Sequence, residues 1–376
     1  MFNHQTKAIL KSALLFKQQK KSLPQTLIFF VTSRCNARCT FCLYYDQITH
    51  PVKVQEELTI SEIELIAKNY GKLHYLALSG GEPFIRKDIG DLCQIFIDHC
   101  KTAVIDIPSN FYYTDSMLTA MTTLVKKNPN VIFDLQISID QIGKKHDESR
   151  KVKNLYETAL KTFSELAMVR KHHPNLKLKV NVVYLEKNRN DLHIIKSALK
   201  EKIDSNRIQL TYPHELLPPN FQFTAQHQDK LEHYIQIAEE FMEDPQKNTS
   251  MDFYTLAMRS VKKTYHRILK EALTNKRNLG QLCEAGRYIV VINEKGDVFP
   301  CEPLWKPIGN LRSYNYNLKN ILNSSEYKDF REKYLGPGKC NCTWSCAALS
   351  SISVQPRFLP EIALNSFQIL LKDFKK

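Results

Sequence analysis

The chain has 376 residues, of which 43% are hydrophobic and 24% charged, a composition typical of globular proteins and not of disordered or fibrous ones. No apolar run reaches the ~18 residues of a membrane-spanning helix. The formal net charge is +14 and there are ten cysteines. A basic surface of this kind could meet phosphates, nucleic acid or an anionic membrane, although a simple solvated surface explains it equally well.

The first 45 residues contain no Asp or Glu. Within them, residues 7–21 read as a basic amphipathic helix, which we assign to an N-terminal region 1–23. We expect this helix to pack on the main domain; the alternative is peripheral contact with a membrane surface. The segment lacks the apolar core and cleavage site of a signal peptide, so we expect a cytoplasmic protein. Disulfides are rare in the cytosol, which makes metal binding the leading use for ten cysteines.

Residues 24–215 alternate between short apolar strands and amphipathic helices. One helix is well delimited, with a capping box at Thr59 and Glu62 and a C-terminal stop at Gly71. Alternation of this kind predicts parallel strands joined by helical crossovers, with the chemistry at the carboxyl ends of the strands. The expected fold is therefore α/β, a partial (β/α)6 TIM-like barrel. The six strands are expected within 26–35, 74–79, 103–110, 131–140, 176–185 and 206–213.

The alternation stops near residue 216. We expect a helical linker over 216–278, a small cysteine-rich α+β domain over 279–355, and a basic C-terminal tail over 356–376. The stretch RYIVVINEKGDVFPC reads as a hairpin that turns at EKGD. Two other cysteines, Cys93 and Cys100, recur at helical spacing among apolar residues and are expected to be core residues.

Three cysteines, Cys35, Cys39 and Cys42, directly follow the first expected strand. Soft thiolates favour zinc or iron–sulfur over hard cations. A structural zinc ion takes four protein ligands, whereas an iron–sulfur cubane with three cysteines keeps one iron open for another molecule. The three-thiol loop therefore favours a cluster that also binds a small molecule.

This C-x3-C-x-aromatic-C spacing, with Phe41 as the aromatic residue, resembles the signature of radical S-adenosylmethionine (radical SAM) enzymes. The likeness continues in the turn Gly80, Gly81, Glu82 and Pro83 after the second strand, and in the polar turn at Ser109 and Asn110 after the third. Ser138 and Asp140 end the fourth strand, and His146, Asp147 and Arg150 match an H-D-x-x-R pattern. The usual Asp-Gly pair is Asp140-Gln141 here, so that turn departs from the family.

The resemblance implies a [4Fe–4S] cluster on Cys35, Cys39 and Cys42 whose open iron binds S-adenosylmethionine (SAM). The Gly80–Pro83 turn would hold the methionine ammonium, and Phe41 would lie near the adenine. Ser138 and Asp140 would face the ribose, and Arg150 would pair with a carboxylate or form a surface ion pair. An electron from a donor such as flavodoxin or ferredoxin would cleave SAM to methionine and a 5′-deoxyadenosyl radical, which takes hydrogen from a substrate.

A second group of cysteines lies near the C-terminus and consists of Cys283, Cys301, Cys340, Cys342 and Cys346. It resembles the SPASM and twitch extensions of radical SAM enzymes. Five thiols suit one auxiliary [4Fe–4S] cluster better than two. Our preferred ligands are Cys283, Cys301, Cys342 and Cys346, with Cys340 as the doubtful fifth. Zinc is the alternative.

Two substrate classes compete within this family. Small molecules, including sugars and lipid-linked intermediates, are slightly favoured over ribosomal precursor peptides modified by a SPASM maturase. An alternative from another class is an iron–sulfur scaffold or nucleic-acid-binding protein without catalysis. The intact cysteine loop and GGEP turn argue against that alternative, so nucleic acid is not an expected partner. Peripheral membrane contact through the two basic ends remains a further expectation.

Overall fold

The computed structural model describes residues 23–203, 207–217, 221–243, 252–274, 282–335 and 339–374. The expected helix over 7–21 lies outside the described residues. Among the residues described, no helix is both long and apolar enough to cross a bilayer.

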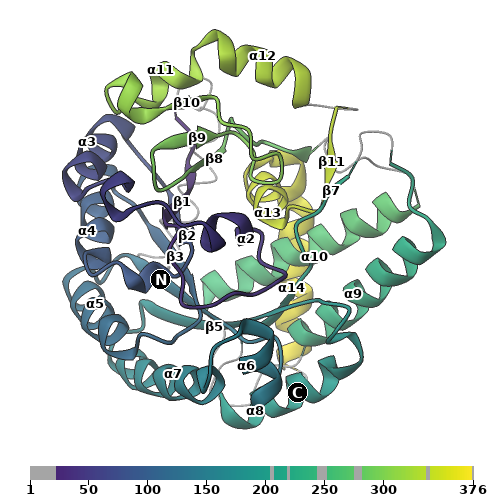
Figure 1. The fold of residues 1–376 in the computed structure, drawn as a ribbon. Helices are drawn as coiled ribbons and strands as arrows, with labels where there is room; N and C mark the ends of the chain where they lie inside the picture. The colour runs from purple at the N-terminus through teal and green to yellow at the C-terminus, as the bar shows by residue number, and fades with distance from the viewer. Residues whose placement is uncertain are drawn as a thin grey trace.

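The predicted α/β barrel is confirmed. Six parallel strands follow one another in chain order and are surrounded by helices on the outside (Figure 1). The strands are β1 Thr26–Thr32, β2 Tyr75–Gly80, β3 Val104–Ser109, β4 Ile132–Ser138, β5 Leu176–Val183 and β6 Ile208–Thr211. The surrounding helices are α3 Ile60–Tyr70, α4 Ile89–Cys100, α5 Thr114–Lys127, α7 Leu155–His172 and α8 Leu192–Lys202.

Helix α3 illustrates how local sequence fixes an element. The Thr59 side chain accepts from the Glu62 backbone N–H, the Glu62 carboxylate accepts from the Thr59 N–H, and Gly71 ends the helix with φ +80°. Both halves of the expected capping box are thus present. On α4, Cys93 and Cys100 are fully buried, as expected of core residues.

The C-terminal hairpin continues the barrel sheet. Strand β8 Ile289–Ile292 runs parallel to β1, and β9 Asp297–Phe299 and β10 Gly309–Asn310 follow antiparallel. A separate two-stranded sheet joins β7 Leu216–Leu217 to β11 Asn341–Cys342. The hairpin that carries part of the second cysteine group therefore pairs with β1, the strand that leads into the first cysteine group. The helices of this region are α11 Leu318–Leu322, α12 Ser325–Tyr334 and α13 Ser345–Val354.

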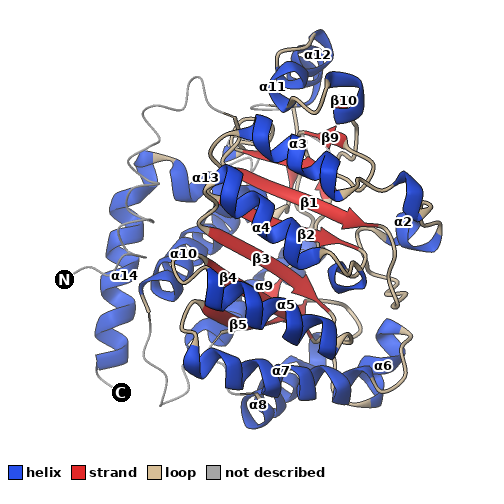
Figure 2. Ribbon diagram, turned by 90° about the vertical axis from the view of Figure 1, so that its left-hand side faces the viewer, coloured by secondary structure: helices blue, strands red, loops and turns tan. Residues whose placement is uncertain are grey.

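Three long helices pack beside the barrel. Helix α9 Ala225–Glu243 contacts β6, and α10 Phe253–Leu273 contacts α9, α13 and α14 Leu359–Phe374. Figure 2 shows α14 on the side of the molecule from which the barrel strands start, with their arrowheads pointing away from it. The remaining short helices are α2 Tyr45–Thr49, α6 Lys144–Arg150, η2 Val54–Glu56, η3 Pro83–Ile85, η4 Arg189–Asp191, η6 Leu311–Tyr314 and η7 Pro356–Phe358.

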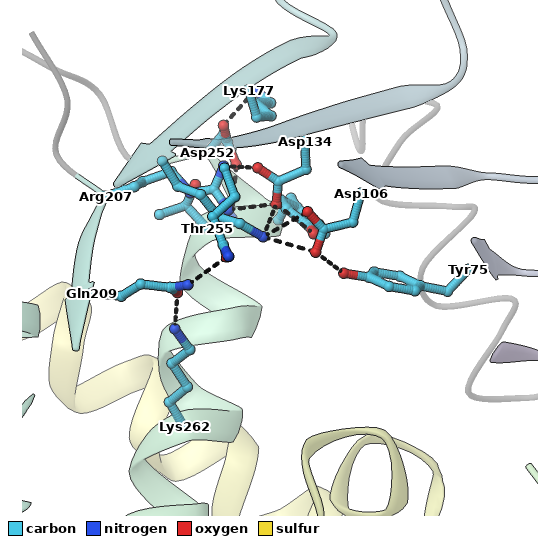
Figure 3. A network of polar contacts seen from close by, with 12 residues as sticks. Tyr75, Asp106, Asp134, Lys177, Arg207, Gln209, Asp252, Thr255 and Lys262 are labelled. Carbon is cyan, nitrogen blue, oxygen red and sulfur yellow. Dashed lines mark hydrogen bonds and ion pairs between the residues drawn. The ribbon is translucent and has the colours of Figure 1, made fainter. Parts of the chain in front are cut away.

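An ionic network fills the amino-terminal end of the barrel (Figure 3). Asp134 is fully buried and accepts from Arg207 at 2.8 Å and from the Lys179 ammonium at 3.2 Å. Lys179 also reaches Asp106 at 2.9 Å. Because each buried charge has an opposite partner, the network fixes these strands relative to one another.

Helix α10 contacts the residues around this network at two points, its N-cap and its middle. Its N-cap Asp252 accepts from Lys177 at 2.6 Å, and Lys262 donates to Gln209 (Figure 3). Burial, together with the charges of Lys179 and Arg207, lowers the pKa of Lys262 to about 7. The network closes one end of the barrel and leaves the carboxyl end of the strands for the candidate site.

Candidate functional site

The three-cysteine loop leaves the carboxyl end of β1. It is held by backbone bonds, including Arg38 N–H to Arg150 O at 3.0 Å and Cys42 N–H to Cys39 O at 3.1 Å. Backbone N–H groups also point at two of the sulfurs: Ala37 to Cys35 Sγ at 3.3 Å and Tyr44 to Cys42 Sγ at 3.4 Å. N–H donors of this kind stabilise thiolates, the form that binds iron.

The thiols themselves are poorly disposed to ionise without a cation. Burial, with smaller effects from Glu82 and the other thiols, raises the pKa of Cys35 to about 12. Burial likewise raises the pKa of Cys42 to about 11, and the neighbouring Cys39 thiolate contributes to this rise. Binding of a metal would therefore release protons from this loop, and the bound cations would supply the missing positive charge.

The described residues contain no group of three or more His, Cys, Asp or Glu side chains arranged around a single metal ion. In a single-ion site all sulfurs bond one metal at ~2.3 Å, which brings them within about 4 Å of one another. In a cubane each cysteine bonds a different iron, so a wider set of sulfurs is required. The described side chains therefore form no ready-made site for a single metal ion, whereas a cluster needs sulfurs that are farther apart.

The two glycines of the GGEP turn let β2 approach the cysteine loop. A Cβ on Gly81 would lie 2.0 Å from the Arg34 carbonyl oxygen, and one on Gly80 would lie 2.3 Å from that of Thr32. The Gly81 N–H bonds Thr32 O at 2.7 Å and the Glu82 N–H bonds Arg34 O at 2.9 Å. Only glycine permits this contact, which fixes the loop immediately before Cys35.

Glu82 is 2% exposed and its carboxylate already has three protein donors. It accepts from Ser109 Oγ at 2.7 Å, from the Asn110 N–H at 2.9 Å and from the Phe84 N–H at 3.2 Å. Burial nevertheless raises its pKa. Glu82 thus joins the ends of β2 and β3, so Ser109 and Asn110 contact the GGEP turn directly, and Pro83 starts the short helix η3.

Asp140 and Arg150 form a buried ion pair behind the loop. Arg150 Nε and Nη2 donate to Asp140 Oδ2 at 3.0 and 2.5 Å, and Asp140 Oδ1 accepts from the Val183 N–H at 2.9 Å. The guanidinium lies 5.8 Å from the centre of the Phe41 ring. Burial acts to lower the pKa of Arg150, but Asp140 and the Cys39 thiolate outweigh it and raise that pKa.

The carboxylate partner of Arg150 is therefore Asp140 of the same chain. The pair places a permanent cation beside Cys39, where it favours the thiolate. The sequence did not predict this ion pair or its burial. The two residues are ten positions apart, and their side chains meet only because α6, which ends at Arg150, turns back toward the end of β4. Ser138, which the sequence also suggested, ends β4 in register with Asn181 of β5.

One donor in the loop has no partner. Asn36 Nδ2 is buried and lacks a hydrogen bond, although the Asn36 carbonyl accepts from Asn110 Nδ2 at 2.8 Å. A buried amide without an acceptor is costly. Together with the N–H groups aimed at sulfur and the Arg150 cation, it suits a loop that holds an anionic thiolate cluster and a polar ligand.

The second cysteine group gathers four thiols. Cys283, Cys301, Cys340 and Cys342 lie near enough for their charges to affect one another, and burial raises the pKa of Cys283 to about 12 and of Cys342 to about 11. Cys301 and Cys340 are buried, whereas Cys346 is exposed. Cys346 has a different neighbour.

That neighbour is His214, which sequence reasoning missed. Its Nε2 lies 3.4 Å from Ser345 Oγ and its Nδ1 3.7 Å from Glu302 Oε1. Burial acts to lower the pKa of His214, but the neighbouring Cys346 and Glu302 side chains raise it to about 10. Thr343 sets this position, because its hydroxyl donates to Pro213 O at 2.8 Å. No local motif around His214 signals such a partner.

Aromatic packing joins the two cysteine groups. Trp305 stacks on Phe299 with ring centres 4.3 Å apart and meets Tyr44 of the first loop at 5.4 Å. The Tyr44 hydroxyl donates to Glu294 Oε2 at 2.5 Å. The region of the C-terminal hairpin therefore packs against Tyr44, the N-cap of α2, which follows Cys42.

Two family models match the chain in the order of these two sites. The model of the radical SAM superfamily matches residues 29–198, and that of an iron–sulfur cluster-binding domain, SPASM, matches residues 283–347. This chain belongs to the radical SAM superfamily. Its radical SAM domain contains the first cysteine loop, and its SPASM domain contains the second group. The two domains imply [4Fe–4S] clusters and SAM as cofactors.

Curated relatives of this radical SAM protein include several GTP 3′,8-cyclases. That of Campylobacter jejuni subsp. jejuni (serotype O:2) is 26% identical over 185 residues, covering 48% of this chain and 53% of the relative. That of Staphylococcus aureus (strain JH9) is 31% identical over 176 residues, covering 44% and 47%. A third, from Pseudomonas aeruginosa, is 41% identical over only 66 residues, which is 20% of its length. The chain thus spans about half the length of these relatives, or less.

Solved structures share the fold over a greater length. Native anSMEcpe with bound AdoMet gives a TM-score of 0.55 at 16% identity and covers 94% of this chain and 100% of that one. Streptococcus suis SuiB bound to S-adenosylmethionine gives 0.56 at 15% identity, covering 86% and 72%. At such identities the likeness concerns the fold of the radical SAM and SPASM domains.

Proposed function

We propose that this protein is a radical SAM enzyme that binds SAM at a [4Fe–4S] cluster held by Cys35, Cys39 and Cys42. Once bound, that cofactor pair supplies reductive cleavage of SAM and a radical that takes hydrogen from a substrate. The observation that carries the proposal is the loop itself, in which backbone N–H groups and Arg150 lie beside one buried and two half-buried thiols at the carboxyl end of the barrel.

The surrounding residues position this loop. Gly80 and Gly81 keep β2 against Thr32 and Arg34, and Glu82 ties that turn to the end of β3. Asp140 holds Arg150 in place behind Cys39. The Gly80–Pro83 backbone, Phe41 and Ser138 remain our proposed contacts for SAM, and Asn36 Nδ2 is an added donor for the same ligand.

For the auxiliary [4Fe–4S] cluster we favour Cys283, Cys301, Cys340 and Cys342. Sequence spacing favoured Cys346 over Cys340, but the mutual proximity of the four thiols and the exposure of Cys346, which lies beside His214, support the reverse choice. Two serine variants form a matched test. Cys340→Ser should lower the iron per chain and remove one cluster from the Mössbauer spectrum, whereas Cys346→Ser should leave both unchanged.

We favour a small-molecule substrate, such as a sugar or a lipid-linked intermediate, over a ribosomal peptide. The curated relatives are named for a cyclase of GTP, which agrees with a small molecule. A peptide remains the alternative, because the structural neighbour anSMEcpe was also solved with a Cp18Cys peptide. We propose a cytoplasmic location and a flavodoxin or ferredoxin as the reductant.

The decisive experiment is reductive cleavage of SAM. Protein reconstituted anaerobically with iron and sulfide, then mixed with SAM and dithionite, should release 5′-deoxyadenosine. The Cys39→Ala variant should lose this activity, while Cys93→Ala, a change at a buried helical thiol, should keep it when folded. Intact SAM in the wild-type reaction, despite a full complement of iron, would favour the scaffold alternative.

A further inference from the structure

Helix α14 turns its apolar side away from the protein. Leu364 is 56% exposed, Phe367 59%, Leu370 37% and Leu371 43%. Their spacing at i, i+3, i+6 and i+7 places them on one face of the helix. Exposed apolar side chains are ordinary when scattered, but a contiguous face of them marks a contact surface.

The opposite side of α14 faces inward and is mixed, because Ile369 is buried there and Ile362 packs on the core beside several polar side chains. Asn365 Nδ2 donates to Thr264 Oγ1 at 3.1 Å, and the hydroxyls of Ser366 and Ser260 lie 2.8 Å apart. Glu361 pairs with Arg267 at 2.7 Å. A helix on a water-facing surface normally keeps its outward side polar, so the exposed apolar side of α14 is the unusual one. Specific bonds therefore hold the apolar face outward.

One cation lies at the edge of this face and two more are exposed near the ends of α14. The Lys263 ammonium donates to Gln368 Oε1 at 3.1 Å beside the stripe, and Lys372 and Arg357 are exposed. The four apolar positions themselves carry no charge, and the whole chain has a net charge of +14. A second copy of the chain would bring the same cations together, whereas an anionic lipid surface complements them.

We propose that the outward face of α14, formed by Leu364, Phe367, Leu370 and Leu371, docks into the headgroup region of an anionic membrane. An apolar stripe with flanking cations is the pattern of helices that lie in this interface. The face stands on the side from which the barrel strands start, so the cysteine loop at their far ends points away from the bilayer (Figure 2). This inference does not depend on the proposed chemistry.

The test is flotation of the full-length protein with vesicles of phosphatidylcholine, with and without phosphatidylglycerol. The wild type should float with the anionic vesicles and less so as salt is raised. The double variant Leu364→Glu/Phe367→Glu should bind at least ~10-fold more weakly, because two charges enter the interface. Ile194→Glu and Met168→Glu are matched controls at 65% and 55% exposure on other helices and should bind like the wild type.

Circular dichroism melts report whether each variant folds, and Phe367→Ser replaces the double variant if that one does not. Three results would overturn the proposal. The first is a wild type that fails to float with anionic vesicles, and the second is a double variant that floats as well as the wild type. The third is a dimer seen by light scattering that the double variant abolishes, which would assign the face to a second copy of the chain.

Discussion

Replacing Gly81 with alanine should displace the first cysteine loop. The new Cβ would lie 2.0 Å from the Arg34 carbonyl oxygen, so the two segments must separate by about 1.4 Å to reach ordinary contact. That movement strains the bonds from the Gly81 and Glu82 N–H groups to Thr32 O and Arg34 O. Overpacking costs ~1–3 kcal/mol and each lost hydrogen bond ~0.5–1.5 kcal/mol, so destabilisation on the order of 3 kcal/mol is expected.

The assay combines a thermal melt of the apoprotein with iron analysis after anaerobic reconstitution. Because Cys35 follows Arg34 directly, the Gly81→Ala variant should lose iron from the first cysteine group as well as melting temperature. Gly90→Ala is the control, since its Cβ would meet nothing nearer than 3.9 Å and alanine favours a helix. A Gly81→Ala protein with wild-type iron and melting temperature would refute this account of the GGEP turn.

Three further predictions follow from buried contacts. Asp140→Asn should cost ~3–5 kcal/mol of unfolding free energy in denaturant titrations, because it leaves Arg150 buried without its anion, and should also reduce iron uptake; an unchanged midpoint would contradict it. Lys262, with its pKa lowered to about 7, holds a proton in the unfolded chain that the folded chain lacks as pH rises above 7. The stability of the wild type relative to Lys262→Met should therefore rise with pH between 7 and 8.5, by up to ~1.4 kcal/mol per unit, and a flat difference would count against the shift. Trp305→Ala should cost ~2–3 kcal/mol in the same titrations, because this ring is only partly buried, and should loosen the first loop, measured as faster alkylation of Cys42 in the apoprotein; equal alkylation rates would show that the Trp305 contact does not restrain the loop.

Local signals predicted the elements well. The capping box at Thr59 and Glu62 involves residues three apart, so the sequence alone specifies it. The same is true of the six alternating strands and of the loop that places Cys35, Cys39 and Cys42 after β1. Each of these depends on neighbours along the chain or on a spacing pattern.

Pairings between distant segments were not predictable in this way. His214 meets Cys346 only because Thr343 bonds the backbone at Pro213. Arg150 could have faced a ligand, solvent or a carboxylate of the chain, and its sequence pattern does not distinguish these. The apolar stripe of α14 is visible in the sequence, yet its outward orientation depends on polar bonds to α10.

The two ends of the barrel are organised for different tasks. At the amino end, Asp134 and its cationic partners form a closed network that no ligand needs to complete. At the carboxyl end, the thiols have raised pKa values and Asn36 Nδ2 lacks an acceptor, so that end is stabilised when a cluster and a ligand bind. Because α14 stands at the amino end, changes on its outward face should alter vesicle binding without altering iron content, and changes in the cysteine loop should do the opposite.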